Sequence, residues 1–330
     1  MMKFLKKYTV ILLLLVLIAY FAVSARGFAT SGNIISLLRQ VAVLGIVSVG
    51  MTMVIITGNI DLSVGNLVSM VTCLVAMMIV NFGMEPVWAC MLGVVVAMVC
   101  CTLNGVIILS TNMPAMLCTL ATMQIFQGLT YMFTGAIPIY GLPESMRFLG
   151  QGYVGFIPVP VIIMGVIFLV GAFVLTKTYI GRYFYAVGSN AEAARLSGIP
   201  VTATKLLSYT ICGFFVGIAG IVLTSRMFSG HPTAGTGLEM EVVTAVVVGG
   251  VAFSGGSGKI LGVVQGVALM GVLSNGLGIM GVGTHAQLVF KGIILLLVVG
   301  LDCWQQKKQR MAKMILPTAA ALPDKSGKGE

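Results

Sequence analysis

Long runs of apolar residues, separated by short polar segments, extend from residue 8 to residue 301. A helix needs about 20 apolar residues to cross the hydrocarbon core of a bilayer. Two of the runs are long enough for two such helices, and they are divided at the breaker sequences Asn-Met-Pro (112–114) and Gly-Val-Gly (281–283). The pattern predicts ten transmembrane helices, which lie within residues 8–25, 40–60, 62–84, 86–143, 148–176, 206–225, 242–258 and 260–301.

The overall composition agrees with a chain that lipid covers. Only 8% of the 330 residues are charged and 58% are hydrophobic, whereas a soluble domain carries about 25% charged residues. We therefore expect an all-α, polytopic transmembrane helical bundle over residues 1–304. The basic tail, residues 305–330, contains much Pro, Ala, Gly and Lys, and we expect it to be disordered.

The net charge of +10 bears on orientation. Lys and Arg accumulate in the cytoplasmic segments of membrane proteins, and most of the nineteen basic residues fall there if the N-terminus is inside. With ten spans, both termini are then cytoplasmic, and so is the longest internal connection, residues 177–205. This explains the charge without nucleic-acid binding. The first run also has features of a cleavable signal peptide, but its length favours an uncleaved span.

The cysteines and histidines show no pattern of a metal site or a disulfide framework. Six of the seven cysteines lie within apolar runs and lack ligand-like spacing. The two histidines, His231 and His285, belong to different short connections. We expect the cysteines to act as small buried packing residues.

The segment TGNIDLSVGN, residues 57–66, places several polar side chains between two apolar runs. One interpretation is a tight cytoplasmic turn in which the aspartate caps the next helix. The other is a broken helix beside a transport cavity, where irregular backbone and ionisable groups are tolerated in a membrane. The residues alone leave both interpretations open. Its candidate residues for a translocation pathway are Asn59, Asp61, Ser63 and Asn66.

Further polar side chains lie inside or at the start of later predicted spans. Amides without nearby acidic partners suit hydrogen bonding to a neutral, hydroxyl-rich solute better than metal binding, although hydrogen bonds between helices are an alternative. Lys291 lies within the last apolar run, and one interpretation is that its ammonium group snorkels toward the interface. The further pathway candidates are Gln124, Gln127, Glu239, Glu241 and Asn275.

The glycine-rich stretch FSGGSGKI, residues 253–260, superficially resembles a phosphate-binding loop. That motif requires a glycine where this chain has Phe253 and a hydroxyl residue where it has Ile260. Both required positions fail, so the stretch is predicted to be a tight turn. Residues 57–65 and 248–256 also share glycines and a serine in register, a weak indication of an internal repeat with broken segments in corresponding places.

The predicted cytoplasmic loop 177–205 contains a short helix with clear boundaries. Asn190 is a favourable N-cap, Gly198 is suited to end the helix, and Pro200 prevents its continuation. Such a helix is either a simple connector or a rigid contact for a cytoplasmic partner, and the residues do not decide between these.

Several motifs in this chain resemble those of one transporter family. EAARLSG, residues 192–198, resembles the coupling segment of permease subunits in bacterial ATP-binding-cassette (ABC) importers. GNIDLSVG, AVGSNAEAARLSGI, PTAGTGLEMEVVTAVVVGGVAFSGGSGKILG and VFKGIILLLVVGLD resemble segments of the ribose-type monosaccharide permeases. They occur in the expected order between about residues 33 and 302.

The resemblance implies a permease subunit in a bacterial inner membrane, paired with a second copy or a paralogue. Separate cytoplasmic ATPase subunits would bind ATP and Mg²⁺, and an extracytoplasmic protein would deliver the sugar, so this chain would be neither an enzyme nor a cofactor binder. Glycines with an implied structural role are Gly58, Gly65, Gly249 and Gly250. Residues implied in coupling to the ATPase are Glu192, Ala193, Ala194, Arg195 and Gly198.

Two other classes of function are weighed against this one. An ion-coupled sugar symporter would need no ATPase and would rely on a titratable intramembrane group, for which Asp61 is the candidate. A membrane-embedded enzyme would need a nucleophile and a base close together, and the sequence shows no such pattern. The identity of the sugar is beyond the sequence.

Overall fold

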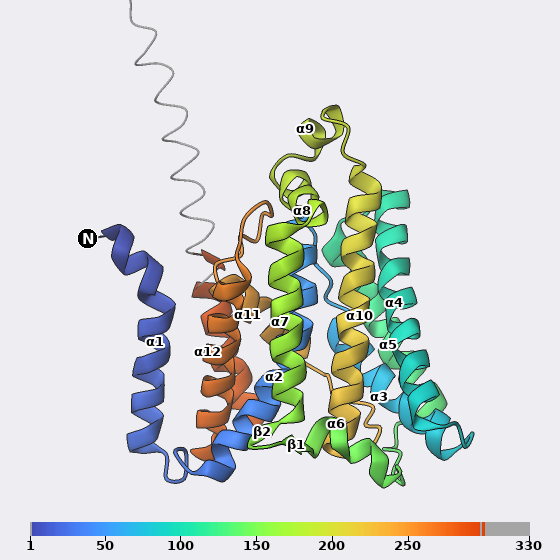
Figure 1. Ribbon diagram of the computed structural model, residues 1–330, viewed down its shortest axis with the longest axis vertical. Helices are drawn as coiled ribbons and strands as arrows, with labels where there is room; N and C mark the ends of the chain where they lie inside the picture. Colours follow the sequence, from blue (N-terminus) through green and yellow to red (C-terminus); the bar gives the residue numbers. More distant parts are fainter. Residues whose placement is uncertain (1, 298, 301–330) are drawn as a thin grey trace, which may run out of the picture.

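The computed structural model describes residues 2–297 and 299–300 (Figure 1), so the predicted tail lies outside the described residues. The chain folds as a bundle of helices that run along one common direction. Five of them are long and apolar enough to cross a membrane, which confirms a polytopic helical protein; the count of ten remains a prediction. These five are α2 (Ser31–Ile56), α4 (Pro86–Thr111), α7 (Val159–Lys177), α10 (Val201–Met227) and α12 (Ile260–Ile279).

The remaining helices of the bundle are less apolar or shorter. They are α1 (Met2–Ser24), α3 (Val64–Val80), α5 (Ala115–Thr134), α11 (Leu238–Val248) and a last helix, Thr284–Leu297. Both predicted breaks are confirmed, because α4 ends at Thr111 before α5, and α12 ends at Ile279 before the last helix.

Several predicted runs differ in extent from the helices that form within them. The run 40–60 begins too late, because α2 starts at Ser31. The run 242–258 contains only the second part of the 11-residue α11, which is about 16 Å long at 1.5 Å per residue, because Gly249 and Gly250 end the helix and Gly250 has φ +83°. The run 62–84 yields the 17-residue α3. The run 148–176 contributes only α7 to the bundle, because residues 148–158 fold into other elements.

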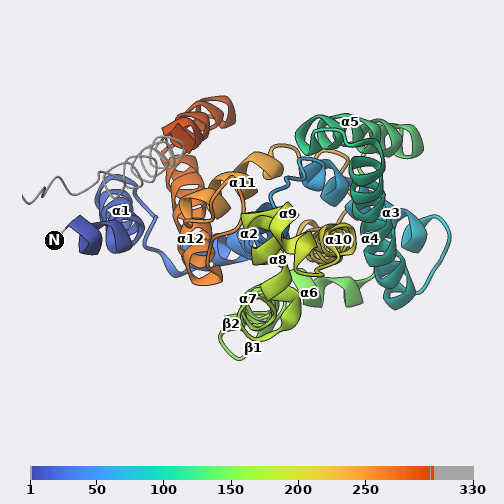
Figure 2. The same ribbon diagram turned by 90° about the horizontal axis from the view of Figure 1, so that it is seen from above.

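The core of the bundle is formed by α2, α4 and α10, with α10 between the other two (Figure 2). Small residues let these helices approach closely. A Cβ atom on Gly50 of α2 would lie 2.9 Å from the Cα of Cys212 in α10, and one on Gly213 would lie 2.6 Å from the carbonyl oxygen of Ala97 in α4. From Val41 to Ile56, every residue of α2 is buried.

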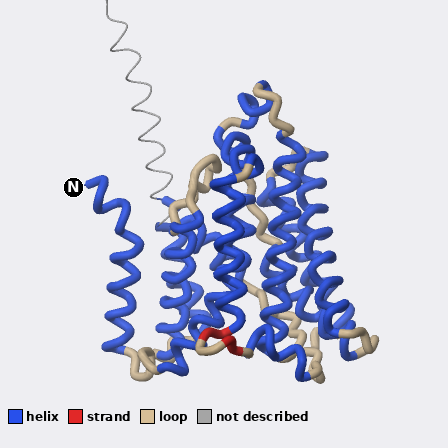
Figure 3. The backbone as a smooth tube through the Cα atoms, in the orientation of Figure 1, coloured by secondary structure: helices blue, strands red, loops and turns tan. Residues whose placement is uncertain are grey.

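Short elements cover the two ends of the bundle (Figure 3). At one end lie η1 (Glu144–Met146), α6 (Arg147–Gln151) and the antiparallel hairpin of β1 (Tyr153–Val154) and β2 (Ile157–Pro158). At the other end, here called the α9 end, lie α8 (Tyr179–Ser189) and α9 (Ala191–Leu196), and α1 starts toward this same end.

Candidate translocation and coupling sites

The segment 57–63, between α2 and α3, is irregular and mostly buried. Asp61 and Ser63 are fully enclosed by protein, so the segment is not an exposed turn. One oxygen of Asp61, Oδ1, accepts hydrogen bonds from the Ser63 backbone N–H at 2.9 Å and from the Ser63 hydroxyl at 2.6 Å. Asp61 therefore holds the residue that precedes α3, Ser63, inside the bundle, but it does not cap the helix as the first interpretation predicted, because no side-chain hydrogen bond caps α3.

Residues from two core helices complete this buried cluster. The Asn104 amide nitrogen, from α4, donates to the Ser63 hydroxyl at 2.9 Å and lies 3.4 Å from each carboxylate oxygen of Asp61. The Tyr209 hydroxyl, from α10, donates to the backbone oxygen of Ile60 at 3.3 Å. A buried carboxylate needs such donors to offset its lost hydration. The cluster fixes segment 57–63 against α4 and α10.

The two short helices α3 and α11 begin next to each other. A Cβ atom on Gly65, in the first turn of α3, would overlap the Glu239 carboxylate of α11 and lie 2.6 Å from the backbone oxygen of Gly235. The irregular segment 229–237 reaches this point along α3, because the backbone N–H of Gly235 donates to the Ser69 hydroxyl at 2.8 Å. Short helices that start inside a membrane protein direct their positive ends at a shared interior site.

Glu239 lies at the junction of these two helix starts. Its side chain is almost completely buried, and its Oε2 atom has no hydrogen-bond partner among the described residues. An unpaired buried oxygen is costly, so this atom would gain free energy from a hydrogen-bond donor that reached it. The sequence does not indicate that Gly65 and Gly235 lie beside Glu239, because Gly65 is far from the other two residues along the chain.

A row of amide groups continues from this junction toward α5. The Asn66 amide nitrogen donates to the backbone oxygen of Met123 at 3.0 Å and to the side-chain oxygen of Gln127 at 3.4 Å. Gln127 in turn donates to the Tyr131 hydroxyl at 2.9 Å. Gln124 is exposed on α5. The structure thus brings Asn66 and Gln127 together, and Tyr131 is a member that the sequence did not indicate.

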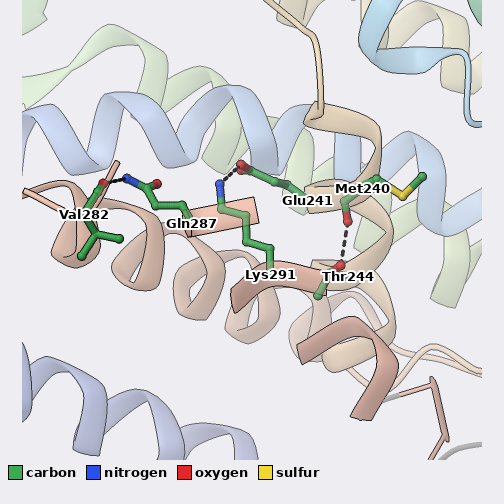
Figure 4. A network of polar contacts seen from close by, with 6 residues as sticks. All are labelled: Met240, Glu241, Thr244, Val282, Gln287 and Lys291. Carbon is green, nitrogen blue, oxygen red and sulfur yellow. Dashed lines mark hydrogen bonds and ion pairs between the residues drawn. The ribbon is translucent and has the colours of Figure 1, made fainter. Parts of the chain in front are cut away.

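Glu241 lies two residues after Glu239 and has a charged partner (Figure 4). Its carboxylate forms an ion pair with the ammonium group of Lys291 in the last helix, and the two side chains are only 23% and 14% exposed. The interpretation that Lys291 snorkels is wrong, because its ammonium group pairs with an opposite charge within the bundle. The presence of opposite charges in two apolar runs was the signal that could have predicted this pair.

Two pathway candidates are not part of this arrangement. Asn275 of α12 exchanges two hydrogen bonds of 2.9 Å with Asn33 of α2, which joins these helices. The Asn59 amide nitrogen is buried and lacks a partner among the described residues. Within the same part of the chain, no three side chains of the His, Cys, Asp or Glu type gather where they could hold a metal ion.

The predicted short helix in the loop 177–205 is confirmed as α9. The Asn190 side-chain oxygen accepts a hydrogen bond from the Ala193 backbone N–H at 3.0 Å, and Gly198 follows the helix with φ +80°. Glu192 and Arg195 form an exposed ion pair of 2.6 Å. Ala194 is buried, whereas its neighbours, including Ala193, are exposed. The second helix of this loop, α8, was not predicted.

The glycine-rich turn predicted between the last spans is also confirmed. Residues 249–259 connect α11 to α12 at the α9 end. A Cβ atom on Gly249 would lie 2.7 Å from the backbone oxygen of Gly262, so the turn packs tightly on the start of α12. The Gly256 backbone N–H donates to the Ile56 oxygen at 2.9 Å, which places the two sequence-related segments side by side.

Comparison with known proteins gives a consistent result over most of the chain. Residues 33–299 match the family model described as branched-chain amino acid transport system / permease component. The chain is 44% identical to the ribose import permease protein RbsC of Bacillus subtilis (strain 168) over 88% of this chain and 90% of that protein. It is 38% identical to RbsC of Escherichia coli (strain K12), over 90% and 92% of the two chains.

A relative with a different named sugar covers as much of the chain. The L-arabinose transport system permease protein AraH of Escherichia coli (strain K12) is 34% identical, over 92% of each chain. No solved structure is significantly similar to the chain. Because the family model covers the bundle from the start of α2 to the last helix, the chain belongs to the family of branched-chain amino acid transport system permease components.

Proposed function

We propose that this chain is the membrane-spanning permease subunit of an ATP-driven importer of a monosaccharide. The observation that carries the proposal is the 44% identity to a ribose import permease over 88% of the chain. We further propose that it works in a bacterial inner membrane as a dimer, with ATP and Mg²⁺ bound by separate ATPase subunits. An extracytoplasmic binding protein would deliver the sugar. Ribose is the sugar named for the relatives at 44% and 38% identity, and a related pentose is compatible with the arabinose relative.

The junction of α3 and α11 would form part of the sugar pathway. A sugar offers hydroxyl groups that both donate and accept hydrogen bonds, and the junction supplies the free Glu239 oxygen together with the amides of Asn66 and Gln127. Several weak hydrogen bonds would hold the sugar in the pathway and still allow it to be released on the other side of the membrane. The exposed Gln124 of α5 would extend this polar row.

The α9 end would receive the ATPase. In α9, the charged side chains of Glu192 and Arg195 are 64% and 70% exposed, and the Asn190 cap together with Gly198 fixes both ends of the helix. A capped helix keeps its shape when a partner pushes it, so it can pass on a displacement.

The alternative, an ion-coupled symporter, would need a carboxylate that gains and loses a cation or proton during transport. Asp61 is enclosed by the donors of Ser63 and Asn104, an arrangement suited to a permanent structural role. Glu239 is the better-placed carboxylate for a symporter. One uptake experiment distinguishes the importer from the symporter.

The experiment is uptake into proteoliposomes that contain the permease, a cognate ATPase and the binding protein. Labelled ribose, arabinose and xylose should accumulate only when ATP is available to the ATPase, and a catalytically inactive ATPase is the matched control. Uptake that follows a proton or sodium gradient in the absence of ATP would reject the importer and favour the symporter.

A further inference from the structure

Three segments meet at the α9 end with almost no space between their backbones. They are the last turn of α8, the end of α2 where segment 57–63 begins, and the glycine-rich turn after α11. A Cβ atom on Gly188 of α8 would overlap the Ile56 carbonyl oxygen and lie 2.6 Å from the backbone nitrogen of Gly256. Only a residue without a side chain fits at Gly188, because both neighbours are backbone and cannot rotate away.

Hydrogen bonds connect the same three segments. The Gly256 backbone N–H donates to the Ile56 oxygen at 2.9 Å. From α8, the Tyr185 hydroxyl donates to the Gly258 oxygen at 2.8 Å, and the Ser189 hydroxyl donates to the Gly256 oxygen at 3.4 Å. Burial raises the pKa of Tyr185, so this hydroxyl stays protonated and able to donate at physiological pH.

A second close contact joins the two irregular segments directly. Gly255 has φ +86°, and a Cβ atom there would lie 2.8 Å from the Cα of Gly58. Segment 57–63 continues into α3 through the Asp61 cluster, and the glycine-rich turn follows α11 without interruption. The contact therefore connects α8 to both short helices whose starts meet at Glu239.

At its other side, α8 is joined to α9 by a single residue, Asn190, whose side chain caps α9. Because only this residue separates the two helices, α8 would move when α9 moves. From α8, the backbone contacts at Gly188 lead to segment 57–63 and to the glycine-rich turn at the same time.

We propose that Gly188 and Gly256 are positioning residues, which hold α8 and the two irregular segments together so that α9 moves α3 and α11 as one unit. The inference rests on the proposed function, because the partner that moves α9 would be the ATPase. It goes beyond that function by naming the contact through which the movement reaches the interior junction.

The test uses the change Gly188→Ala. This position is helical and does not have positive φ, so alanine should favour α8 itself through its higher helix propensity, and any loss must come from the backbone contacts. Gly165→Ala in α7 is the matched control, because it is also helical and a Cβ atom there would have no neighbour within 4 Å. Tyr185→Phe removes only the hydroxyl and serves as a milder second variant.

The first readout is backbone hydrogen exchange of the purified permease, which requires neither sugar nor ATPase. We expect faster exchange at residues 254–258 in Gly188→Ala and a smaller increase in Tyr185→Phe, with no change in Gly165→Ala. Unchanged exchange at residues 254–258 in both α8 variants would overturn the proposal.

The second readout is coupling in the assembled transporter. Gly188→Ala should lower sugar uptake per ATP hydrolysed by about tenfold, within the usual range of coupling between distant sites, while Gly165→Ala matches the unmodified protein. Faster exchange with unchanged coupling would also overturn the proposal. Failure of the proposed function is recognised separately, since the unmodified protein would then show no ATP-dependent uptake at all.

Discussion

Asp61 combines an ionisable side chain with complete burial, and its neighbours explain why this is tolerated. The donors of Ser63 are local, two residues away, and the third donor comes from Asn104 of α4. The local part of this arrangement could be predicted from the sequence, because aspartate side chains often bond to their own backbone two residues on. The contribution of Asn104 could not, because it depends on how α4 packs beside segment 57–63.

We predict that Asp61→Ala lowers both stability and transport. The change leaves the backbone N–H and the hydroxyl of Ser63 without the acceptor that Asp61 provides, at a cost of about 1–3 kcal/mol for each unsatisfied buried group. Thermal unfolding of the purified protein and sugar uptake measure the two effects. Ser110→Ala, at an exposed position of α4, is the control. A stability equal to that of the control would show that the Asp61 cluster does not hold segment 57–63.

Glu239 differs from Asp61, because one of its buried carboxylate oxygens accepts no hydrogen bond from the described residues. If that oxygen accepts a sugar hydroxyl, Glu239→Ala should reduce uptake at saturating binding protein by about tenfold or more, since a hydrogen bond to a charged group contributes about 1.5–3 kcal/mol. Glu239→Gln should retain more activity, because its amide oxygen still accepts. Met240→Leu, an exposed neighbour, should be unaffected. Equal activity of the alanine and unmodified proteins would remove Glu239 from the pathway.

At the scale of elements, the apolar runs located the long helices but not the ends of the short ones. The sequence 242–258 is uniformly uncharged, yet α11 starts earlier, at Leu238, and ends at Val248. Its first turn contains Glu239 and Glu241, and acidic residues favour a helix start, whereas Gly249 and Gly250 end it. The irregular segment 229–237 explains why α11 can be so short. This segment runs along α3, where the Gly235 backbone N–H donates to the Ser69 hydroxyl, and so takes the place of a longer helix. Those contacts are tertiary and could not be predicted from the spacing of apolar residues.

The ion pair between Glu241 and Lys291 joins α11 to the last helix, and its effect belongs to these elements. Lys291→Met should destabilise the protein by about 3 kcal/mol, because the remaining carboxylate is left largely buried and unpaired. The double change Lys291→Met/Glu241→Met should recover most of this loss, since neither charge then needs a partner. Thermal unfolding of the single and double variants distinguishes the cases. A double variant no more stable than Lys291→Met alone would show that the pair is not what connects these helices.

At the scale of the whole molecule, the two ends of the bundle are covered by different short elements. The α9 end carries α8, α9 and the glycine-rich turn, while the opposite end carries the β1–β2 hairpin and α6. The distribution of Lys and Arg predicts that the α9 end faces the cytoplasm. That assignment and the proposed ATPase contact depend on each other, because an ATPase in the cytoplasm can only reach α9 if the charge rule holds for this chain.

Labelling of single cysteines tests this orientation directly. In a background without the native cysteines, we predict that Leu196→Cys in α9 reacts with a membrane-impermeant maleimide only in inverted vesicles. Phe156→Cys in the hairpin should react only in intact cells with a permeable outer surface. Both native side chains are largely exposed, at 81% and 99%, so reagent access is limited by the membrane and not by the fold. Reaction of Leu196→Cys from outside intact cells would place α9 on the wrong side for an ATPase, and the importer mechanism would fail together with the charge argument.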